Sequence, residues 1–229
     1  MALYAIGDTH LSLGADKSME VFGGSWEGYV EKLEEGFSCV SDDDTVVLCG
    51  DLSWGMSLEE AKKDLEFLNS RLPGEKWILK GNHDYWWNTA SKMNAFFQAN
   101  GLERLHILHN NCAFYGDVAL CGTRGWFYEE QANAPSGKVF RREVMRLETS
   151  LKAAGEAEKY CFLHYPPLYK GYQCPEILQL LEQYQVKLCC YGHLHGPSHR
   201  LAVEGMQGSV AYQLVAADYI GFCPKKILD

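Results

Sequence analysis

Five short stretches of the chain carry side chains that could bind metal ions. They contain five of the eight histidines, together with aspartates and one asparagine. The stretches are Gly7-Asp8-Thr9-His10, Gly50-Asp51, Gly81-Asn82-His83-Asp84, His164-Tyr165-Pro166-Pro167 and Gly192-His193-Leu194-His195. Carboxylate, amide and imidazole donors together suit Mn, Fe, Zn or similar cations better than thiolate-bound zinc or all-oxygen calcium. One carboxylate, that of Asp51, could bridge two cations about 3.5 to 4 Å apart, as in two-metal hydrolysis.

All five stretches follow apolar runs that are typical of β-strands. Strands are expected at residues 3–6, 45–49, 76–79, 104–108, 113–121, 159–163, 186–191, 199–203 and 209–214, with a hairpin turn at Gly116-Asp117. In α/β sheets, the loops at the carboxyl ends of strands converge on one crevice. Side chains that are far apart in the chain could therefore meet there.

Helices are expected between the early strands. Apolar residues recur at intervals of three and four over residues 26–40 and 58–68, and Ser57 and Glu60 have the spacing of a capping box. Further helices are expected at residues 90–99, 141–154 and 176–184, and a long loop at residues 122–138. This order predicts an α/β fold, a mixed two-sheet β-sandwich flanked by helices, in a single domain over residues 1–229.

The composition narrows the class of partner and the compartment. A formal net charge of −9 without any basic block disfavours binding of long nucleic acid. The nine cysteines are odd in number and have no CxxC spacing, so they are expected to be buried free thiols. No removable apolar segment precedes Leu3-Tyr4-Ala5-Ile6, and no run approaches membrane-spanning length. A cytoplasmic location is expected, and the oligomeric state is left open.

The five stretches, taken as an ordered set, resemble a known family. DxH, GD, GNHD, a later histidine and GHxH occur in this order between residues 8 and 195, as in the calcineurin-like metallophosphoesterase superfamily. A single DxH or GHxH is a weak signal, whereas the ordered set is strong. The resemblance implies a four-layer fold with two mixed sheets between helices, in agreement with the pattern of strands and helices above.

The resemblance also implies a role for each residue of the stretches. Around one of two divalent ions it places Asp8, His10, Asp51 and His195. Around the other it places Asp51, Asn82, His164 and His193. A hydroxide activated by both ions would attack phosphorus, and His83 would protonate or stabilise the leaving oxygen. The neighbouring Asp84 would orient the His83 ring and support its protonated form.

Two features of the loops are open to alternative interpretations. Arg124, between Gly122-Thr123 and Gly125-Trp126, could grip a phosphate with both guanidinium arms or be an ordinary salt-bridged residue. Aromatic side chains in the loops could pack in the core or form a wall for an organic leaving group. These are Trp54, Tyr85, Trp86, Trp87, Trp126, Phe127, Tyr128, Tyr165 and Tyr172. The histidines outside the stretches are expected to be structural, namely His106, His109 and His199.

Departures from subfamily patterns narrow the expected substrate. The run from Gly50 to Gly55 lacks the phosphate-gripping Arg of protein Ser/Thr phosphatases, and Trp54 stands where purple acid phosphatases have an iron-binding tyrosine. The chain is also shorter and less basic than the DNA-break nucleases of the superfamily. We therefore expect hydrolysis of a small organic phosphodiester or pyrophosphate. The alternatives are a phosphomonoesterase that uses the same site and a non-catalytic interaction scaffold.

Overall fold

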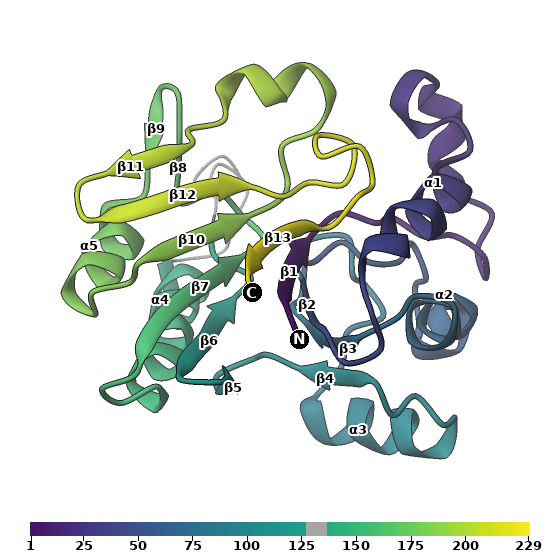
Figure 1. Cartoon of the computed structure of the whole chain (residues 1–229), viewed down its shortest axis with the longest axis horizontal. Helices are drawn as coiled ribbons and strands as arrows, with labels where there is room; N and C mark the ends of the chain where they lie inside the picture. Colours follow the sequence, from purple (N-terminus) through teal and green to yellow (C-terminus); the bar gives the residue numbers. More distant parts are fainter. Residues whose placement is uncertain (127–136) are drawn as a thin grey trace.

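Two β-sheets packed face to face form the centre of the molecule. The structure, a computed structural model, describes residues 1–126 and 137–229. The first sheet has five strands in the order β13 (Lys225–Leu228), β1 (Leu3–Ile6), β2 (Thr45–Leu48), β3 (Glu75–Ile78) and β4 (Leu105–Ile107). Strands β1 to β4 are parallel, and β13 pairs antiparallel with β1 at the edge (Figure 1).

The second sheet has six strands. Their order is β11 (Gly205–Gln207), β12 (Val210–Leu214), β10 (Leu188–Tyr191), β7 (Glu158–Leu163), β6 (Val118–Thr123) and β5 (Cys112–Tyr115). The four inner strands are parallel, and the edge strands β11 and β5 are antiparallel to their neighbours. A small separate hairpin is formed by β8 (Leu168–Tyr169) and β9 (Tyr172–Gln173).

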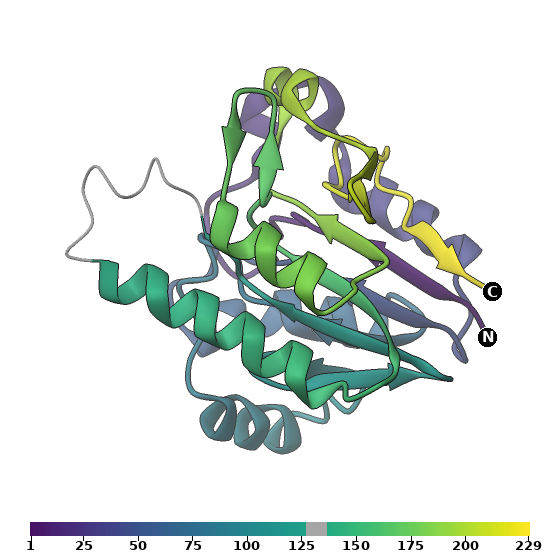
Figure 2. The ribbon, with the colours of Figure 1, turned by 90° about the vertical axis from the view of Figure 1, so that its left-hand side faces the viewer.

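Helices cover the outer face of each sheet. On the side of the five-stranded sheet lie α1 (Tyr29–Gly36), α2 (Leu58–Ser70) and α3 (Ala90–Ala99) (Figure 1). On the side of the six-stranded sheet lie α4 (Gly137–Ala153) and α5 (Pro175–Gln183) (Figure 2). Short 3-10 helices η1 (Met19–Phe22), η2 (Gly24–Trp26), η3 (Phe37–Cys39) and η5 (Gly196–Leu201) connect these elements. The predicted sandwich flanked by helices is thus confirmed.

The core follows from the alternation of side chains along the strands. In β1, Leu3 and Ala5 point into the space between the sheets, where they join an apolar cluster with Phe162 of β7. The next residue, Ile6, points to the opposite face and joins a cluster with Leu33 of α1. All of these side chains are fully buried. Because both faces of the sheet are covered, its strands are nearly continuous apolar runs.

Several local predictions can be compared with the structure. Ser57 caps α2 and its hydroxyl accepts a hydrogen bond from the Glu60 backbone N–H, as the capping box predicts. The hairpin turn lies between Tyr115 and Val118, also as predicted. The strand expected at residues 199–203 is wrong, because the chain there forms η5, with Pro197 in its first turn. Most of the long loop expected at residues 122–138 lies outside the described residues.

The cysteines are free thiols within the part of the chain that the structure describes. Six of them are buried, and burial raises the pKa of the Cys121 thiol to about 12. The prediction of burial is wrong for Cys39 and Cys223, which are exposed with their sulfur atoms 3.8 Å apart. In the described ranges, no helix is long and apolar enough to cross a membrane.

Candidate metal centre

The predicted ligands meet at the carboxyl ends of the parallel strands. They follow β1 (Asp8 and His10), β2 (Asp51), β3 (Asn82), β7 (His164) and β10 (His193 and His195). The two sheets touch at this end, where the Gly7 N–H donates to the Val215 carbonyl oxygen at 2.7 Å and the Ala217 N–H donates to the Gly7 carbonyl oxygen at 3.0 Å. Ligands from both sheets therefore face one another.

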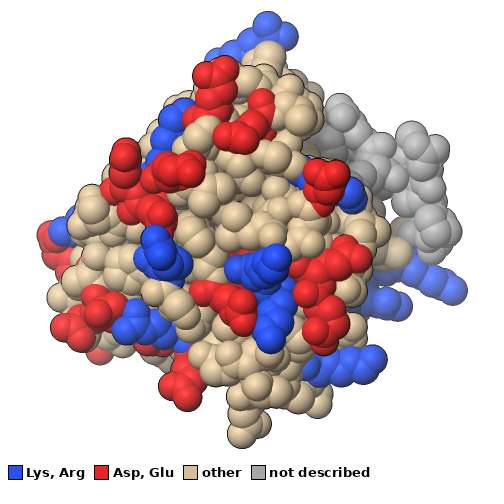
Figure 3. Space-filling model, turned by 90° about the vertical axis from the view of Figure 1, so that its right-hand side faces the viewer, with Lys and Arg blue, Asp and Glu red and all other residues tan. Residues whose placement is uncertain are grey.

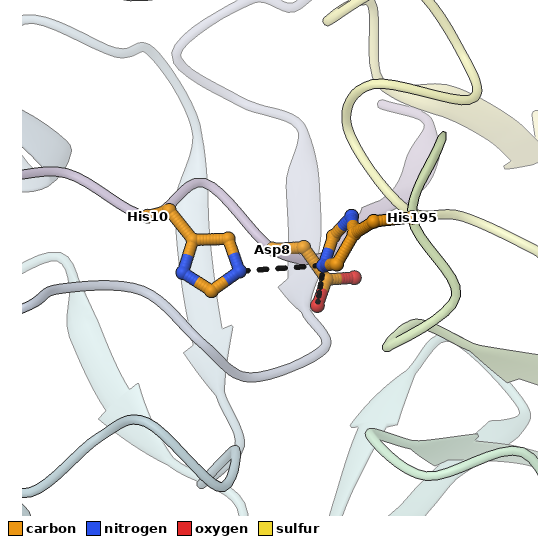
Figure 4. A group of neighbouring side chains, drawn as sticks. All are labelled: Asp8, His10 and His195. Atoms are coloured by element: carbon orange, nitrogen blue, oxygen red, sulfur yellow. Dashed lines mark hydrogen bonds and ion pairs between the residues drawn. The ribbon is translucent and has the colours of Figure 1, made fainter. Parts of the chain in front are cut away.

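Asp8, His10 and His195 form the first cluster (Figure 4). The possible ligand atoms of the three residues all lie within 4.8 Å of one another. His195 Nε2 is 3.3 Å from His10 Nε2 and 3.3 Å from Asp8 Oδ1. Asp8 is fully buried and also accepts hydrogen bonds from the His193 backbone N–H. One carboxylate and two imidazoles thus converge on one point, as a cation requires.

Asp51, His164 and His193 form the second cluster. His164 Nε2 lies 3.5 Å from Asp51 Oδ2 and 2.6 Å from Asn82 Oδ1. The other ring nitrogen of His164, Nδ1, lies 3.1 Å from the Cys49 carbonyl oxygen. That carbonyl accepts a hydrogen bond from Nδ1–H, so the Nε2 lone pair points toward the oxygen atoms of Asp51 and Asn82.

Asp51 lies between the two clusters. Its Oδ2 is 3.5 Å from His164 Nε2 in the second cluster and 3.7 Å from His10 Nε2 in the first. Its other oxygen, Oδ1, accepts a hydrogen bond from the His83 backbone N–H at 2.7 Å. This position agrees with the bridging role that the family resemblance implies for this carboxylate.

The backbone is strained at the centre. Four non-glycine residues of the clusters have positive φ angles, namely Asp8 (61°), His10 (44°), Asp51 (51°) and His193 (72°). Such angles cost on the order of 1 kcal/mol or more each for non-glycine residues, and they concentrate at functional sites. A Cβ atom at Gly81 would lie 2.1 Å from Asp51 Oδ1, and one at Gly192 would lie 2.3 Å from Asp8 Oδ2. These glycines therefore permit a close approach of backbone and carboxylates.

Burial sets the protonation of three candidate ligands. It lowers the pKa of His164 to about 3 and that of His193 to about 3, and it holds the pKa of His10 well below the usual value. The three rings are thus neutral near pH 7. Neutral imidazole is the form that binds a metal ion.

The carboxylates of the clusters lack a permanent cation. Among the described residues, the ion-pair partners of Asp8 and Asp51 are all histidines. Burial, with Asp84 and Asp8 close by, raises the pKa of Asp51 well above the usual range. Burial lowers the pKa of His195, but Asp8 and Asp218 outweigh it and raise that pKa to about 10. His195 is thus protonated near pH 7 and compensates part of the negative charge, and divalent cations bound here would displace that proton and neutralise the two buried carboxylates.

Asp218 is a further residue at the centre that lies outside the five stretches. Its Oδ1 accepts from His195 Nδ1 at 2.9 Å, and its Oδ2 lies 3.2 Å from His199 Nε2. A carboxylate behind a histidine fixes which ring nitrogen faces a metal. One sequence signal could have identified Asp218 as a site residue. It directly follows the apolar run 214–217 at the end of β12, much as Asp51 follows the apolar run of β2. His199 thereby lies near the centre as well.

His83 and Asp84 are adjacent in the chain, but their side chains contact different groups. The His83 ring is outside both clusters, with its centroid 4.5 Å from that of Trp54. The Asp84 carboxylate accepts five hydrogen bonds, from the backbone N–H groups of Asp51, Leu52, Ser53 and Gly81 and from the Trp86 indole N–H. This differs from the expected contact with the His83 ring. Asp84 instead holds the loops after β2 and β3 together.

Arg124 lies beside the second cluster, after β6. Its carbonyl oxygen accepts from the His164 backbone N–H at 3.2 Å. Its guanidinium lies 3.7 Å from the buried Glu143 carboxylate and over the rings of Trp126 and Tyr165. The side chain is therefore partly paired, which is the ordinary salt-bridged alternative, yet it stays 19% exposed.

Asp64 connects the loop after β1 with the loop after β2. It is fully buried in α2 and accepts hydrogen bonds from the Leu13 backbone N–H at 2.6 Å and from the Ser53 hydroxyl. Burial raises its pKa from 3.8 to about 6. The folded state thus binds a proton more tightly than the unfolded state does, and the folded state loses stability as the pH rises from the unfolded through the folded pKa.

We expect Asp64→Asn to remove this loss. Between about pH 4 and pH 7 the native chain should lose up to about 3 kcal/mol of unfolding free energy relative to the variant, because each pKa unit is worth about 1.4 kcal/mol. Asparagine has the same shape and keeps an acceptor for the Leu13 N–H. Denaturant unfolding of both proteins in a chelator measures the difference. A difference that does not change with pH would contradict the prediction.

Comparisons with known proteins agree with this centre. The fold and the two clusters define a two-sheet sandwich with a candidate dinuclear metal site at its strand ends. A model of the calcineurin-like phosphoesterase family matches residues 1–197. The chain therefore belongs to the calcineurin-like phosphoesterase family.

Individual relatives are distant. An uncharacterized metallophosphoesterase of Helicobacter pylori is 27% identical over 154 residues, which are 66% of this chain and 36% of that protein. The match thus spans about a third of that relative. A protein of unknown function from Aquifex aeolicus, AQ665, superposes with a TM-score of 0.54 at 14% identity, over 98% of this chain and 95% of that one. The protein TT1561 of Thermus thermophilus gives a TM-score of 0.55 at 14% identity, over 99% and 97%. These two similarities concern the fold alone.

Proposed function

We propose that this chain, acting as a single domain, hydrolyses a small organic phosphodiester or pyrophosphate. The observation that carries the proposal is the position of Asp51 Oδ2, which faces a histidine of each cluster at 3.5 and 3.7 Å. The mixed oxygen and nitrogen donors favour Mn, Fe or Zn as the two ions. A small substrate agrees with the surface charge, because a long polyanion would need an extended basic surface. The formal net charge is −9, and the face over α1 and α2 mixes acidic and basic side chains (Figure 3).

The site residues are proposed to bind the cations, to donate a proton to the leaving group and to position Asp51. Two divalent cations, when bound, would neutralise phosphate charge and activate water as the nucleophile. The cations would be held by seven residues, namely Asp8, His10, Asp51, Asn82, His164, His193 and His195. His83 would donate a proton to the leaving oxygen, since its ring lines the cleft next to the first cluster. Asp84 would keep Asp51 in place through the loop backbone.

Arg124 is proposed to contact the substrate phosphate. Arg124→Ala should raise KM for a diester about tenfold, because a charge-assisted hydrogen bond is worth about 1.5–3 kcal/mol. Steady-state kinetics measure this change. Arg146→Ala is the matched control, since Arg146 also pairs with Glu143 but lies on α4. An unchanged KM in Arg124→Ala, or an equal rise in both variants, would rule out the phosphate contact.

A metal-supplemented substrate panel tests the proposed function. The purified protein should bind close to two transition-metal ions per chain and cleave bis-p-nitrophenyl phosphate. Organic pyrophosphates and phosphomonoesters complete the panel. Faster turnover of monoesters would favour a phosphomonoesterase. A fully metal-loaded protein that cleaves none of the three classes would contradict the proposal and favour an interaction scaffold.

A further inference from the structure

A cleft of about 540 Å³ opens next to the first metal cluster. Its walls come from η1 and η2, from the loop after β2 and from the start of η5. Three of its lining residues are His10, His83 and His195. A group bound in this cleft would therefore lie directly beside candidate metal ligands and the proposed proton donor.

Aromatic rings dominate the walls of the cleft. Trp54 stacks on the His10 ring, with centroids 5.1 Å apart and an interplanar angle of 23°. Trp26 meets the His195 ring edge-on at 5.7 Å. Phe22 also lines the cleft, although its side chain is 71% exposed.

The charge in the cleft comes mainly from the histidines at its metal end, and Lys17 lies just outside its lining, with Nζ 5.9 Å from the centroid of the Trp54 ring. No Asp, Glu, Lys or Arg is among its lining residues within the described parts of the chain. A charged group would lose its water there without gaining an ion pair. A planar ring, in contrast, gains about 0.5–1.5 kcal/mol for each aromatic pair beyond its burial. The volume also falls within the range of small-ligand sites, about 300–1,000 Å³.

We propose that this cleft binds an uncharged aromatic group of the substrate while the phosphate lies at the metal clusters. The inference rests on the proposed function and deepens it, because it names the substrate class. The substrate is an aryl or nucleoside phosphoester rather than a sugar phosphate or an inorganic polyphosphate. Trp54 and Phe22 are the residues that recognise the ring, and Trp26, which is buried, supports the wall from behind.

Binding of non-hydrolysable pairs tests the inference without any turnover. Titration calorimetry of the Mn-loaded protein should show that phenylphosphonate binds about tenfold more tightly than methylphosphonate, a difference of about 1.4 kcal/mol. The phosphonate analogues of AMP and of ribose 5-phosphate, in which a methylene group replaces the ester oxygen, distinguish a nucleobase from a simple aryl group, and a preference in either pair supports the inference. Equal affinities within both pairs would overturn it. An aromatic preference in a protein that hydrolyses no phosphoester would instead count against the proposed function alone.

Three variants locate the preference in the cleft. Phe22→Ala should reduce the preference for phenylphosphonate about threefold, and Ser25→Trp, which fills the cleft from an exposed position, should abolish it. Val21→Ala is the matched control, because Val21 precedes Phe22 in η1, is 81% exposed and does not line this cleft. Methylphosphonate affinity should stay the same in all three. Equal phenylphosphonate affinity in Phe22→Ala and Val21→Ala, with no loss in Ser25→Trp, would place the ring elsewhere.

Discussion

Asp51→Asn should remove bound metal from both clusters and lower diester hydrolysis by at least about 10³-fold, on the order of 4 kcal/mol in the activation barrier. The carboxylate oxygen Oδ2 faces both clusters, so one substitution affects both sites at once. An amide oxygen carries no net charge and cannot balance two cations. The substitution keeps the shape of the side chain, and its remaining oxygen can still accept from the His83 backbone N–H. Loss of fold therefore does not explain the expected loss of metal.

Metal content and activity are both needed to evaluate Asp51→Asn. The metal content, measured after gel filtration, should fall from close to two ions per chain to well below one. Asp43→Asn is the matched control, because Asp43 lies just before β2, as Asp51 lies just after it, and is exposed. That control should keep both ions and full activity. Two tightly held ions in Asp51→Asn would show that this carboxylate does not bridge the clusters.

The clustering of the candidate ligands could be predicted from the sequence because each lies within four residues after the end of a strand. A parallel sheet brings the carboxyl ends of its strands to one edge, so Asp8 after β1 and Asp51 after β2 become neighbours. His164 follows β7 in the other sheet and still reaches Asp51, because the sheets join at Gly7. The order of the stretches, together with the alternation along the strands, was enough for the fold and the clusters.

The role of Asp84 could not be predicted, because adjacency in the chain does not determine where side chains point. Asp84 follows His83 directly, yet it is fully buried and hydrogen-bonds to the loop after β2. The aromatic residues of the cleft could be predicted only in part. Of the loop aromatics, Trp54 lines the cleft, whereas Trp86 and Tyr165 pack in the interior. The other aromatic rings of the cleft belong to Phe22 in η1 and Trp26 in η2. The residues of these short helices show no clear apolar period, so the sequence does not place them beside the metal centre.

His83→Ala should lower kcat by about 10² to 10⁴ and leave the metal content unchanged. The His83 ring belongs to neither cluster. Its contribution to the clusters comes from the backbone N–H that donates to Asp51 Oδ1 at 2.7 Å, and alanine keeps that N–H. Metal analysis and steady-state kinetics of the same preparation separate the two roles. Loss of metal in this variant would mean that the ring is a ligand.

The leaving group decides whether His83 acts as an acid. A proton donor matters most for a poor leaving group such as an alkoxide and least for p-nitrophenolate, which departs without help. The defect of His83→Ala should therefore grow as the pKa of the leaving alcohol rises across a series of diesters. His106→Ala is the matched control, because His106 pairs with Glu75 on β3 and lies outside both clusters. An equal defect for every leaving group would show that His83 positions the substrate and transfers no proton, since positioning affects all diesters alike.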